Sequence, residues 1–230
     1  MAETGFESQR RAEFYDKNVR QTIPYYETIH NETIDFIKHL KSDVSCWLDT
    51  GCGTGYLVEQ ALAVFPDTRF VLTDPSDGML TQTRKRLAHA DSRVRILDAM
   101  KNEGLDWPEA EPAPQVITAI LCHHYSSRDE RRKAVEKCHQ ILADGGVFVT
   151  FENVAPYTQH GVEKGLKRWG RFQAAQGRSS ELIEKHLQRY DTVYFPIRID
   201  EHVTLLRETG FRIVELLWYS HMQAGFYGIK

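Results

Sequence analysis

The stretch that decides the fold is Trp47-Leu48-Asp49-Thr50-Gly51-Cys52-Gly53-Thr54-Gly55-Tyr56-Leu57. It begins as a short apolar run, passes through three glycines at every second position, and continues with apolar residues at helical spacing. This order predicts a strand, a tight turn and the N-terminus of a helix. Glycine suits such a turn because it adopts positive φ and lets backbone N–H groups approach a ligand closely. The stretch therefore predicts a loop that binds a nucleoside-bearing cofactor.

Two acidic residues follow the next two apolar runs of the chain. Asp74 lies 19 residues after Gly55, about the distance at which a second strand brings a carboxylate to a ribose held over the first loop. We expect Asp74 to accept hydrogen bonds from the ribose hydroxyls; the alternative is a turn that starts at Asp-Pro. Asp98 ends the third run, where it would accept a hydrogen bond from an adenine amino group with Ala99 against the ring, or would only cap a turn.

A pair of histidines follows the continuous apolar run of residues 115–121, which is typical of a strand buried on both faces. Imidazole titrates near neutral pH, so His123 and His124 are the candidate catalytic bases. Adjacent residues that leave a strand point in opposite directions, so at most one of the two is expected to face a ligand. The alternative for both is a hydrogen-bonded structural histidine.

The regular alternation of strands and helices predicts the fold class. We expect an α/β, doubly wound, Rossmann-like sheet of seven strands, mostly parallel, with an antiparallel last strand. Ligands in such sheets lie beyond the carboxyl ends of the strands, near the point where the strand order reverses. Glu152, at the end of a fifth apolar run, also falls at this edge. The expected strands cover residues 47–50, 69–74, 94–99, 115–121, 147–152, 211–217 and 222–229.

The chain is expected to form one domain, residues 1–230, with two helical additions. Residues 1–42 form a helical preface, in which the aromatic residues around Tyr15 and Tyr26 either pack against the sheet or cover a ligand. Residues 157–194 form a helical lid inserted after the fifth strand. Basic and aromatic residues alternate in this insertion, and they would contact a nucleic-acid backbone, bind an acidic small molecule or form a solvated face.

Composition narrows the class of protein. The formal net charge of −3 and the pI near 6.4 argue against a surface built as a whole to hold nucleic acid. The sequence shows no secretory signal and no membrane-spanning run, so we expect a cytoplasmic protein with no membrane partner. The four cysteines lack metal-type spacing and are expected to be reduced, with no metal site. The oligomeric state stays open, a dimer included.

The glycine pattern distinguishes between two cofactor families. Dinucleotide dehydrogenases carry Gly-x-Gly-x-x-Gly after the first strand, whereas this chain has Asp49-x-Gly51-x-Gly53-x-Gly55. In this motif the sequence resembles the class I S-adenosylmethionine-dependent methyltransferases, over roughly residues 44–153 and 199–230. The resemblance implies a methyltransferase enzyme whose cofactor is S-adenosylmethionine.

The same resemblance implies roles for individual residues. The three glycines would surround the methionine part of the cofactor with Asp49 near its amino group, Asp74 would hold the ribose, Asp98 the adenine edge, and the Ile120–Cys122 backbone the remaining wall. The full set of implied cofactor contacts is Asp49, Thr50, Gly51, Gly53, Gly55, Asp74, Asp98, Ala99, Leu121 and Tyr26. The favoured partner is a small-molecule methyl acceptor, and nucleic acid is the less favoured one.

A second resemblance is to the carboxy-S-adenosylmethionine synthases that serve wobble-uridine modification in tRNA. It is carried by Ile23-Pro24-x-Tyr26, by the helix after Gly177-x-Ser179, and by Gly210-Phe211. Two departures argue against the same reaction: the loop has Gly53-Thr54 where those enzymes have Ser-Leu, and their carboxylate-holding arginine aligns with Leu187. Lys185, His186 or Arg189 would substitute after a small shift. A synthase-like or tRNA-modifying enzyme and a non-catalytic protein that binds the cofactor are the alternatives.

Overall fold

The structure, a computed structural model, describes residues 12–230 and contains one seven-stranded sheet. The strands lie in the order β3-β2-β1-β4-β5-β7-β6, and all neighbours are parallel except that β7 runs antiparallel to β5 and β6. The predicted fold class is therefore confirmed. The strands are β1 (Cys46–Thr50), β2 (Arg69–Thr73), β3 (Val94–Ile96), β4 (Val116–Ile120), β5 (Val147–Asn153), β6 (Ile213–Ser220) and β7 (Gln223–Ile229).

Helices follow the strands as the alternating pattern predicts, and two pairs of helices extend the domain. The helices are α2 (Tyr15–Thr22), α3 (Tyr26–Leu40), α4 (Tyr56–Val64), α5 (Asp77–Leu87), α6 (Arg128–Ile141), α7 (Gln159–Ala175), α8 (Ser180–Leu187) and α9 (Ile199–Thr209), with 3-10 turns η1 (Ala88–Ala90), η2 (Asn102–Gly104) and η3 (His123–Tyr125). Helices α2 and α3 lie in the expected preface, of which residues 1–11 fall outside the described part. Helices α7 and α8 form the expected insertion.

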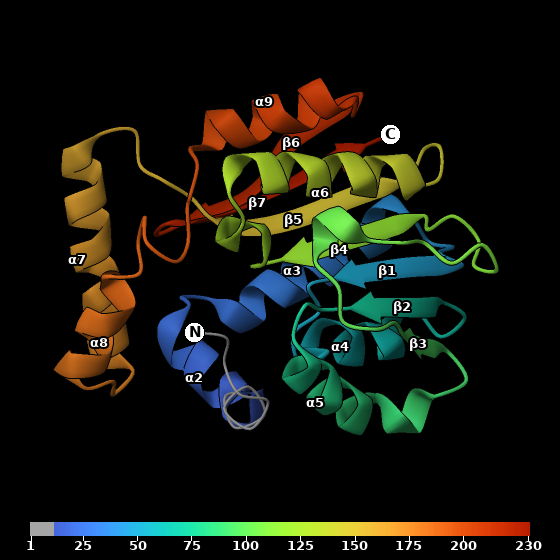
Figure 1. The fold of residues 1–230 in the computed structure, drawn as a ribbon, viewed down its shortest axis with the longest axis horizontal. Helices are drawn as coiled ribbons and strands as arrows, with labels where there is room; N and C mark the ends of the chain where they lie inside the picture. Colours follow the sequence, from blue (N-terminus) through green and yellow to red (C-terminus); the bar gives the residue numbers. More distant parts are fainter. Residues whose placement is uncertain (1–11) are drawn as a thin grey trace.

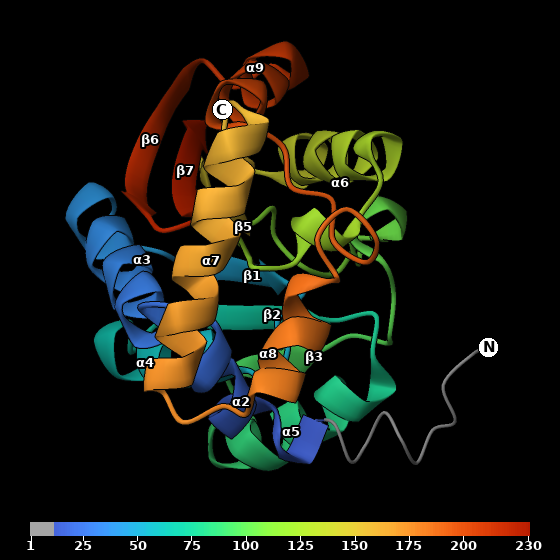
Figure 2. The same cartoon turned by 90° about the vertical axis from the view of Figure 1, so that its left-hand side faces the viewer.

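Two apolar layers enclose the sheet. Trp47, Phe70 and Val149 pack with α3 and α4 on one face, and Leu48 and Phe148 pack with α6 and α9 on the other. Figure 2 shows α3 and α4 on the opposite side of the sheet from α6. Burial of both faces explains why β1 and β4 read as nearly continuous apolar runs.

The carboxyl ends of the parallel strands face the two helical additions. In Figure 1 the arrowheads of β1, β2 and β4 point towards the side on which α2, α7 and α8 lie. The insertion is attached to the preface by buried Trp169, whose Nε1 donates a hydrogen bond to the carbonyl oxygen of Thr22 at 2.6 Å. Both additions therefore stand over the edge where ligands collect in this fold. Within residues 12–230, no helix is long and apolar enough to cross a membrane.

Candidate functional site

The glycine loop between β1 and α4 uses its three glycines in different ways. All three have positive φ, between 58° and 77°. A Cβ on Gly51 would lie 2.6 Å from Cβ of Cys122, and a Cβ on Gly55 would lie 2.9 Å from Cγ2 of Thr83, so both positions are closed by packing. A Cβ on Gly53 would meet nothing within 4 Å. Gly53 therefore leaves free space above the loop, as close approach of a ligand to the backbone requires.

Asp74 joins the end of β2 to this loop. Its Oδ2 accepts a hydrogen bond from the backbone N–H of Gly53 at 2.9 Å, and its Oδ1 accepts one from the N–H of Ser76, also at 2.9 Å. Burial raises the pKa of the Asp74 carboxyl, and the two N–H donors act in the opposite direction. The carboxylate is thus positioned directly beside the open space over Gly53. The neighbouring helix α5 is capped by the side chain of Ser76.

Asp49, at the end of β1, is buried in the wall behind the loop. Thr118 Oγ1 donates a hydrogen bond to its Oδ1 at 2.6 Å, and Trp47 Nε1 donates one to the same threonine oxygen at 2.9 Å. Burial raises the pKa of Asp49 to about 7, against the effect of the Thr118 bond and with a further rise from the charge of Asp74. An ammonium group placed here would favour the ionised carboxylate.

A narrow space of about 30 Å³ connects Asp49 with the aromatic side chains of the preface. Tyr26, His30 and Tyr56 line it, with ring centroids of His30 4.5 Å from Tyr26 and 5.0 Å from Tyr56. Burial, and next the charge of Arg20, lowers the pKa of His30 to about 3. Its buried Nδ1 has no hydrogen-bond partner among the described residues. A neutral imidazole nitrogen is therefore available to a ligand at this end.

The main cavity beyond the strand ends has a volume of about 340 Å³, within the range of about 300–1,000 Å³ usual for small-molecule and cofactor sites. It is lined by Tyr15, Gly51, Gly53, Asp74, Pro75, Ser76, Met79, Lys101, Asn102, Glu103, Ile120, Leu121, Cys122, Tyr125, Ser126 and Glu130. The mixture of apolar walls with a few converging polar groups is typical of a nucleoside site.

Helix α2 covers this cavity and is tied to the glycine loop. Asp16 Oδ1 accepts a hydrogen bond from Thr54 Oγ1 at 2.7 Å, and Asp16 Oδ2 forms an ion pair with Arg86. The guanidinium of Arg86 also donates to the carbonyl oxygen of Thr54 at 2.9 Å. Because Tyr15 precedes Asp16 in the same helix, these bonds fix the tyrosine in the cavity wall.

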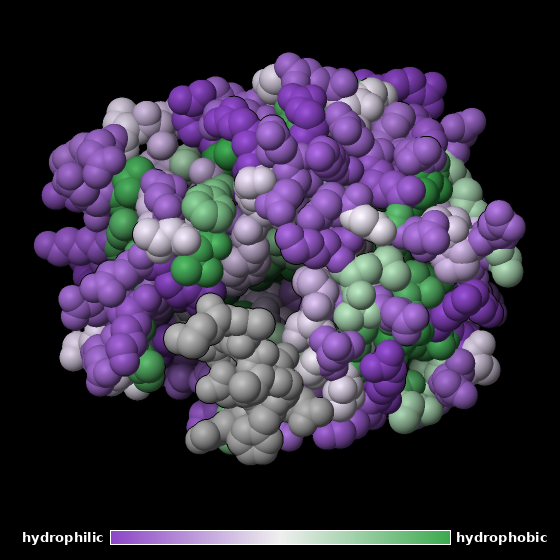
Figure 3. Space-filling model, in the orientation of Figure 1, coloured by the Kyte–Doolittle hydropathy of each residue, from purple (hydrophilic) through white to green (hydrophobic). Residues whose placement is uncertain are grey.

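A second, larger cavity of about 910 Å³ adjoins the first. The two share Tyr15, Leu121 and Tyr125 in their walls. Leu121 has φ of 56°, a costly conformation for a residue with a side chain, and its N–H donates to the carbonyl oxygen of Phe151 at 2.7 Å. The space-filling view shows a mostly polar face with a hollow near its centre (Figure 3). A ligand in the second cavity would therefore lie next to a ligand in the first, beside these three shared residues.

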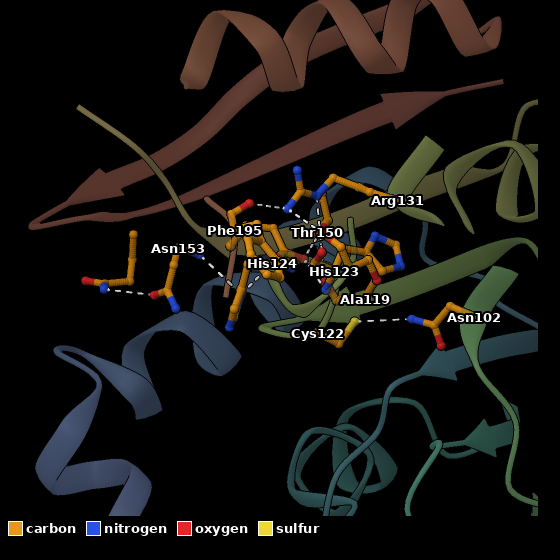
Figure 4. A network of polar contacts seen from close by, with 12 residues as sticks. Asn102, Ala119, Cys122, His123, His124, Arg131, Thr150, Asn153 and Phe195 are labelled. Atoms are coloured by element: carbon orange, nitrogen blue, oxygen red, sulfur yellow. Dashed lines mark hydrogen bonds and ion pairs between the residues drawn. The ribbon is translucent and has the colours of Figure 1, made fainter. Parts of the chain in front are cut away.

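His124 lines the second cavity and forms a buried pair with Glu152 at the end of β5. Nδ1 of His124 lies 2.7 Å from Oε2 of Glu152, and the same oxygen accepts the backbone N–H of His124 at 2.8 Å. The N–H of Asn153 approaches Nδ1 at 3.4 Å, but the shorter contact to a carboxylate makes Nδ1 a donor. Nε2 then carries the lone pair and can accept a proton. Figure 4 shows this network, with His124 on the side of Asn153.

The charge of Glu152 is held by several groups at once. Burial alone would raise its pKa, but the hydrogen bond from His124 and the charges of nearby histidines lower it to about 2. Its Oε1 accepts the backbone N–H of His123 at 3.1 Å. The carboxylate therefore stays ionised near neutral pH and orients the imidazole of His124.

Comparison with known proteins agrees with this geometry. Residues 48–148 match the family model described as a methyltransferase domain. This span runs from the end of β1, through the glycine loop and Asp74, to the start of β5. These residues therefore form a methyltransferase domain, of the kind found in S-adenosylmethionine-dependent methyltransferases. The cofactor of such domains is S-adenosylmethionine.

The proteins similar to this chain fall into two groups. Carboxy-S-adenosyl-L-methionine synthase from Helicobacter hepaticus is 21% identical over 90% of this chain and 87% of the relative. An O-methyltransferase family protein from Burkholderia thailandensis shares the fold with a TM-score of 0.60 at 15% identity, covering 88% of this chain and 56% of the other. Human N-acetylserotonin methyltransferase, solved with S-adenosylmethionine, gives 0.64 at 11% identity, covering 99% and 56%. The chain thus spans little more than half the length of these solved structures.

The residues expected to contact the cofactor are placed unevenly around the cavities. Gly51, Gly53, Asp74 and Leu121 line the 340 Å³ cavity, and Asp49 and Tyr26 line the narrow space beside it. Four others stand back from those walls. The hydroxyl of Thr50 donates a hydrogen bond to Asn102 Oδ1 at 2.5 Å, and Gly55 packs on α5. Asp98 is exposed, and its carbonyl oxygen lies 3.2 Å from Thr73 Oγ1. Ala99, the next residue, is partly buried.

The two histidines lie in the 3-10 turn η3, and their side chains have different surroundings. His124 faces the second cavity, whereas His123 is buried with its ring stacked on Phe148 at a centroid distance of 6.3 Å. Burial lowers the pKa of His123. Arg131 Nε donates to the carbonyl oxygen of His123 at 3.1 Å, so His123 serves the packing of β4 against α6.

Several residues that line the 340 Å³ cavity were not among the expected cofactor contacts, and Tyr15, Met79 and Asn102 are three of them. The sequence around Tyr15 is ambiguous, since an aromatic cluster before the domain is compatible with packing against the sheet and with covering a ligand. Met79 and Asn102 carry no signal, because a methionine in a helix and an asparagine in a loop have no distinguishing spacing. Asn102 is held in the cavity wall by two contacts. Its Oδ1 accepts a hydrogen bond from Thr50, and its Nδ2 lies 3.5 Å from Sγ of Cys122 (Figure 4).

The cysteines and the metal expectation can also be placed. All four cysteines are free thiols, and burial raises the pKa of each, to about 11 for Cys46 and about 12 for Cys138. Among residues 12–230, His, Cys, Asp and Glu side chains form no group of three suited to hold a metal ion.

Proposed function

We propose that this enzyme transfers the methyl group of S-adenosylmethionine to an oxygen or nitrogen atom of a small molecule, with His124 as the general base. The observation that carries the proposal is the His124–Glu152 pair at 2.7 Å, in the wall of a cavity that adjoins the cofactor cavity. The shared wall of Tyr15, Leu121 and Tyr125 would place an acceptor next to the cofactor.

The residues of the first cavity fit the cofactor. The open direction above Gly53 leaves room for it, Asp74 would accept hydrogen bonds from the ribose hydroxyls, and Asp49 would face the ammonium group. Nδ1 of His30 is free to contact the amino-acid end from the other side.

Methyl transfer requires the protein to align the acceptor with the methyl group and to accept one proton from the acceptor. The bound cofactor supplies a methyl group on a positively charged sulfur, which is already a good electrophile. The protein holds the acceptor in line and excludes water, because proximity and orientation lower the barrier without a covalent intermediate. Nε2 of His124 accepts the acceptor's proton, and Glu152 stabilises the imidazolium that forms.

The test begins with the acceptor. The enzyme is incubated with S-adenosylmethionine carrying a tritiated methyl group and with fractionated metabolites, and the labelled product is identified. Single-turnover rates are then measured for His124→Ala and for the matched control His123→Ala. We expect loss of a general base to slow the step by about 10²–10⁴-fold in His124→Ala, with a far smaller change in His123→Ala. Equal rates in wild type and His124→Ala would exclude the base role.

A second candidate function is formation of a carboxylated cofactor. It is favoured by the relatives, since the curated protein from Helicobacter hepaticus is named a carboxy-S-adenosyl-L-methionine synthase. Leu187 packs against α7, but Lys185, His186 and Arg189 all line the second cavity and could hold a carboxylate. Native mass spectrometry of the purified protein separates the two functions. Retention of a cofactor heavier by one carboxylate favours the synthase, and ordinary S-adenosylmethionine or its demethylated product favours methyl transfer.

A further inference from the structure

The second cavity carries a concentration of positive charge. Arg178, Lys185 and Arg189 line it, and among the described residues no Asp or Glu does. Lys185 is exposed and pairs with Glu181 at 2.7 Å, so its charge is already balanced. The two arginines differ from it, because both are half-buried and, within residues 12–230, neither forms an ion pair with a carboxylate.

Arg178 lies in the turn between α7 and α8. Its Nη1 donates to Thr22 Oγ1 and its Nη2 donates to the carbonyl oxygen of Leu182 at 3.4 Å. Its Nε is buried and has no hydrogen-bond partner among the described residues. A buried guanidinium N–H without an acceptor costs free energy, and a ligand atom that accepts its hydrogen bond would remove this cost.

Arg189 follows α8 and lies over two aromatic rings. Its Cζ is 5.9 Å from the ring centroid of Tyr125 and 5.8 Å from that of Tyr194. Contact with ring faces supports the cation but leaves its charge uncompensated. The planar group remains able to bind an oxyanion through two parallel hydrogen bonds.

The charges of the two arginines also act on each other and on His186, which lines the same cavity. Burial and the charge of Arg189 lower the pKa of Arg178. Burial, with the charges of Arg189 and Arg178, lowers the pKa of His186 to about 3. Two like charges in the wall of one cavity repel each other, and an anion that binds both would offset that repulsion.

We infer that the second cavity binds the acceptor through an anionic group, a carboxylate or a phosphate, held between Arg178 and Arg189. The inference rests on the proposed function for the acceptor's role, but the anion site itself does not depend on turnover. Arg178 and Arg189 lie inside a cavity and form no exposed basic stripe, which favours a small molecule over a nucleic-acid strand.

The test uses the full chain saturated with S-adenosylhomocysteine, so that the cofactor cavity is filled. Binding of benzoate, phenyl phosphate and the neutral analogue benzamide is measured by calorimetry at constant ionic strength. Variants are Arg178→Gln, Arg189→Gln, the double variant, and the matched control Arg171→Gln, an exposed arginine of α7 outside the cavity wall. Near-ultraviolet circular dichroism checks the fold of each.

We expect benzoate or phenyl phosphate to bind at least about tenfold more tightly than benzamide, because a charge-assisted bond is lost with the neutral analogue. The preference between carboxylate and phosphate identifies the group. The double variant should lose this advantage, Arg171→Gln should keep it, and Arg178→Lys with Arg189→Lys should retain part of it. Equal binding of benzoate and benzamide, unchanged binding in a folded double variant, absence of anion binding, or binding of a single-stranded oligonucleotide in its place would overturn the inference.

The outcomes separate this inference from the proposed function. If the anionic ligands bind more tightly than benzamide but no methyl acceptor is identified, the anion site is supported and the proposed methyl transfer is wrong. If methyl transfer is found to a neutral acceptor that the double variant methylates with unchanged KM, the reaction stands and the anion site is wrong.

Discussion

Glu152 Oε2 accepts both the backbone N–H of His124 at 2.8 Å and its ring Nδ1–H at 2.7 Å. One carboxylate oxygen thus fixes the position of the main chain and the tautomer of the side chain. The exposed fraction of Glu152 is 0% and that of His124 is 2%, so water competes little for these bonds.

Replacement of this carboxylate should separate binding from chemistry. In Glu152→Gln the imidazole loses its negative partner, and we expect a fall of about 10²-fold in the single-turnover rate with a small change in cofactor affinity. Glu208→Gln, on the exposed side of α9, is the control. An unchanged rate in a folded Glu152→Gln variant would show that His124 needs no orienting carboxylate.

The buried carboxyl of Asp49 should make stability depend on pH. Its pKa in the folded protein is about 7, above the ordinary value of 3.8, so the folded state binds the proton more tightly than the unfolded state. The stabilisation is complete below about pH 4 and is lost as the pH rises through 7, at most about 4 kcal/mol. Asp49→Asn should remove this dependence in the cofactor-free protein and also weaken cofactor binding.

Urea unfolding at pH 5 and pH 8 measures this effect. The free energy of unfolding of wild type should fall between the two values more than that of Asp49→Asn. Asp67→Asn, an exposed carboxyl in the turn after α4, serves as control and should behave as wild type. The idea fails if Asp49→Asn and wild type lose stability in parallel.

Two glycines of one loop should respond differently to replacement by alanine. Gly55→Ala introduces a Cβ 2.9 Å from Thr83 Cγ2 at φ of 77°, and should destabilise the fold by about 2–3 kcal/mol. Gly53→Ala meets open space, so only the backbone cost of about 1–2 kcal/mol applies. Its methyl group would instead enter the cofactor's volume and weaken S-adenosylhomocysteine binding. Unfolding and calorimetry of both variants check this; undiminished cofactor affinity in Gly53→Ala would contradict it.

The contact between α2 and the glycine loop should control cofactor release. Asp16→Asn loses the ion pair with Arg86 and weakens the bond from Thr54. Since both charged groups are partly exposed, the loss of stability should stay below about 1 kcal/mol. The dissociation rate of S-adenosylhomocysteine, followed by stopped flow, should rise because Tyr15 is freed to move. Asp35→Asn on the exposed face of α3 should leave the rate unchanged, and the same rate in Asp16→Asn would rule out this role for α2.

The sequence determined the order of elements and the class of cofactor. A strand that ends in Asp49, three alternating glycines and a helix form a local pattern, so spacing alone was sufficient to predict the junction. The apolar runs likewise predicted a mostly parallel sheet, and the hairpin of β6 and β7 closed it with the expected direction. Predictions of where single strands end were less accurate: β3 ends at Ile96 and not at 99, because pairing with β2 stops there.

Tertiary structure alone decided which side chains meet. Tyr15 and Asp74 line one cavity, and His124 and Glu152 form a buried pair, although the members of each pair are far apart in the chain and no periodicity predicts that they meet. It also decided which expected residues stand back: Asp98 follows a strand as Asp74 does, yet the chain turns so that it is exposed. The convergence of Arg178 and Arg189 depends on how the α7–α8 insertion packs over the strand ends. Local spacing encodes backbone conformation, whereas long-range packing sets charge and reactivity at the site.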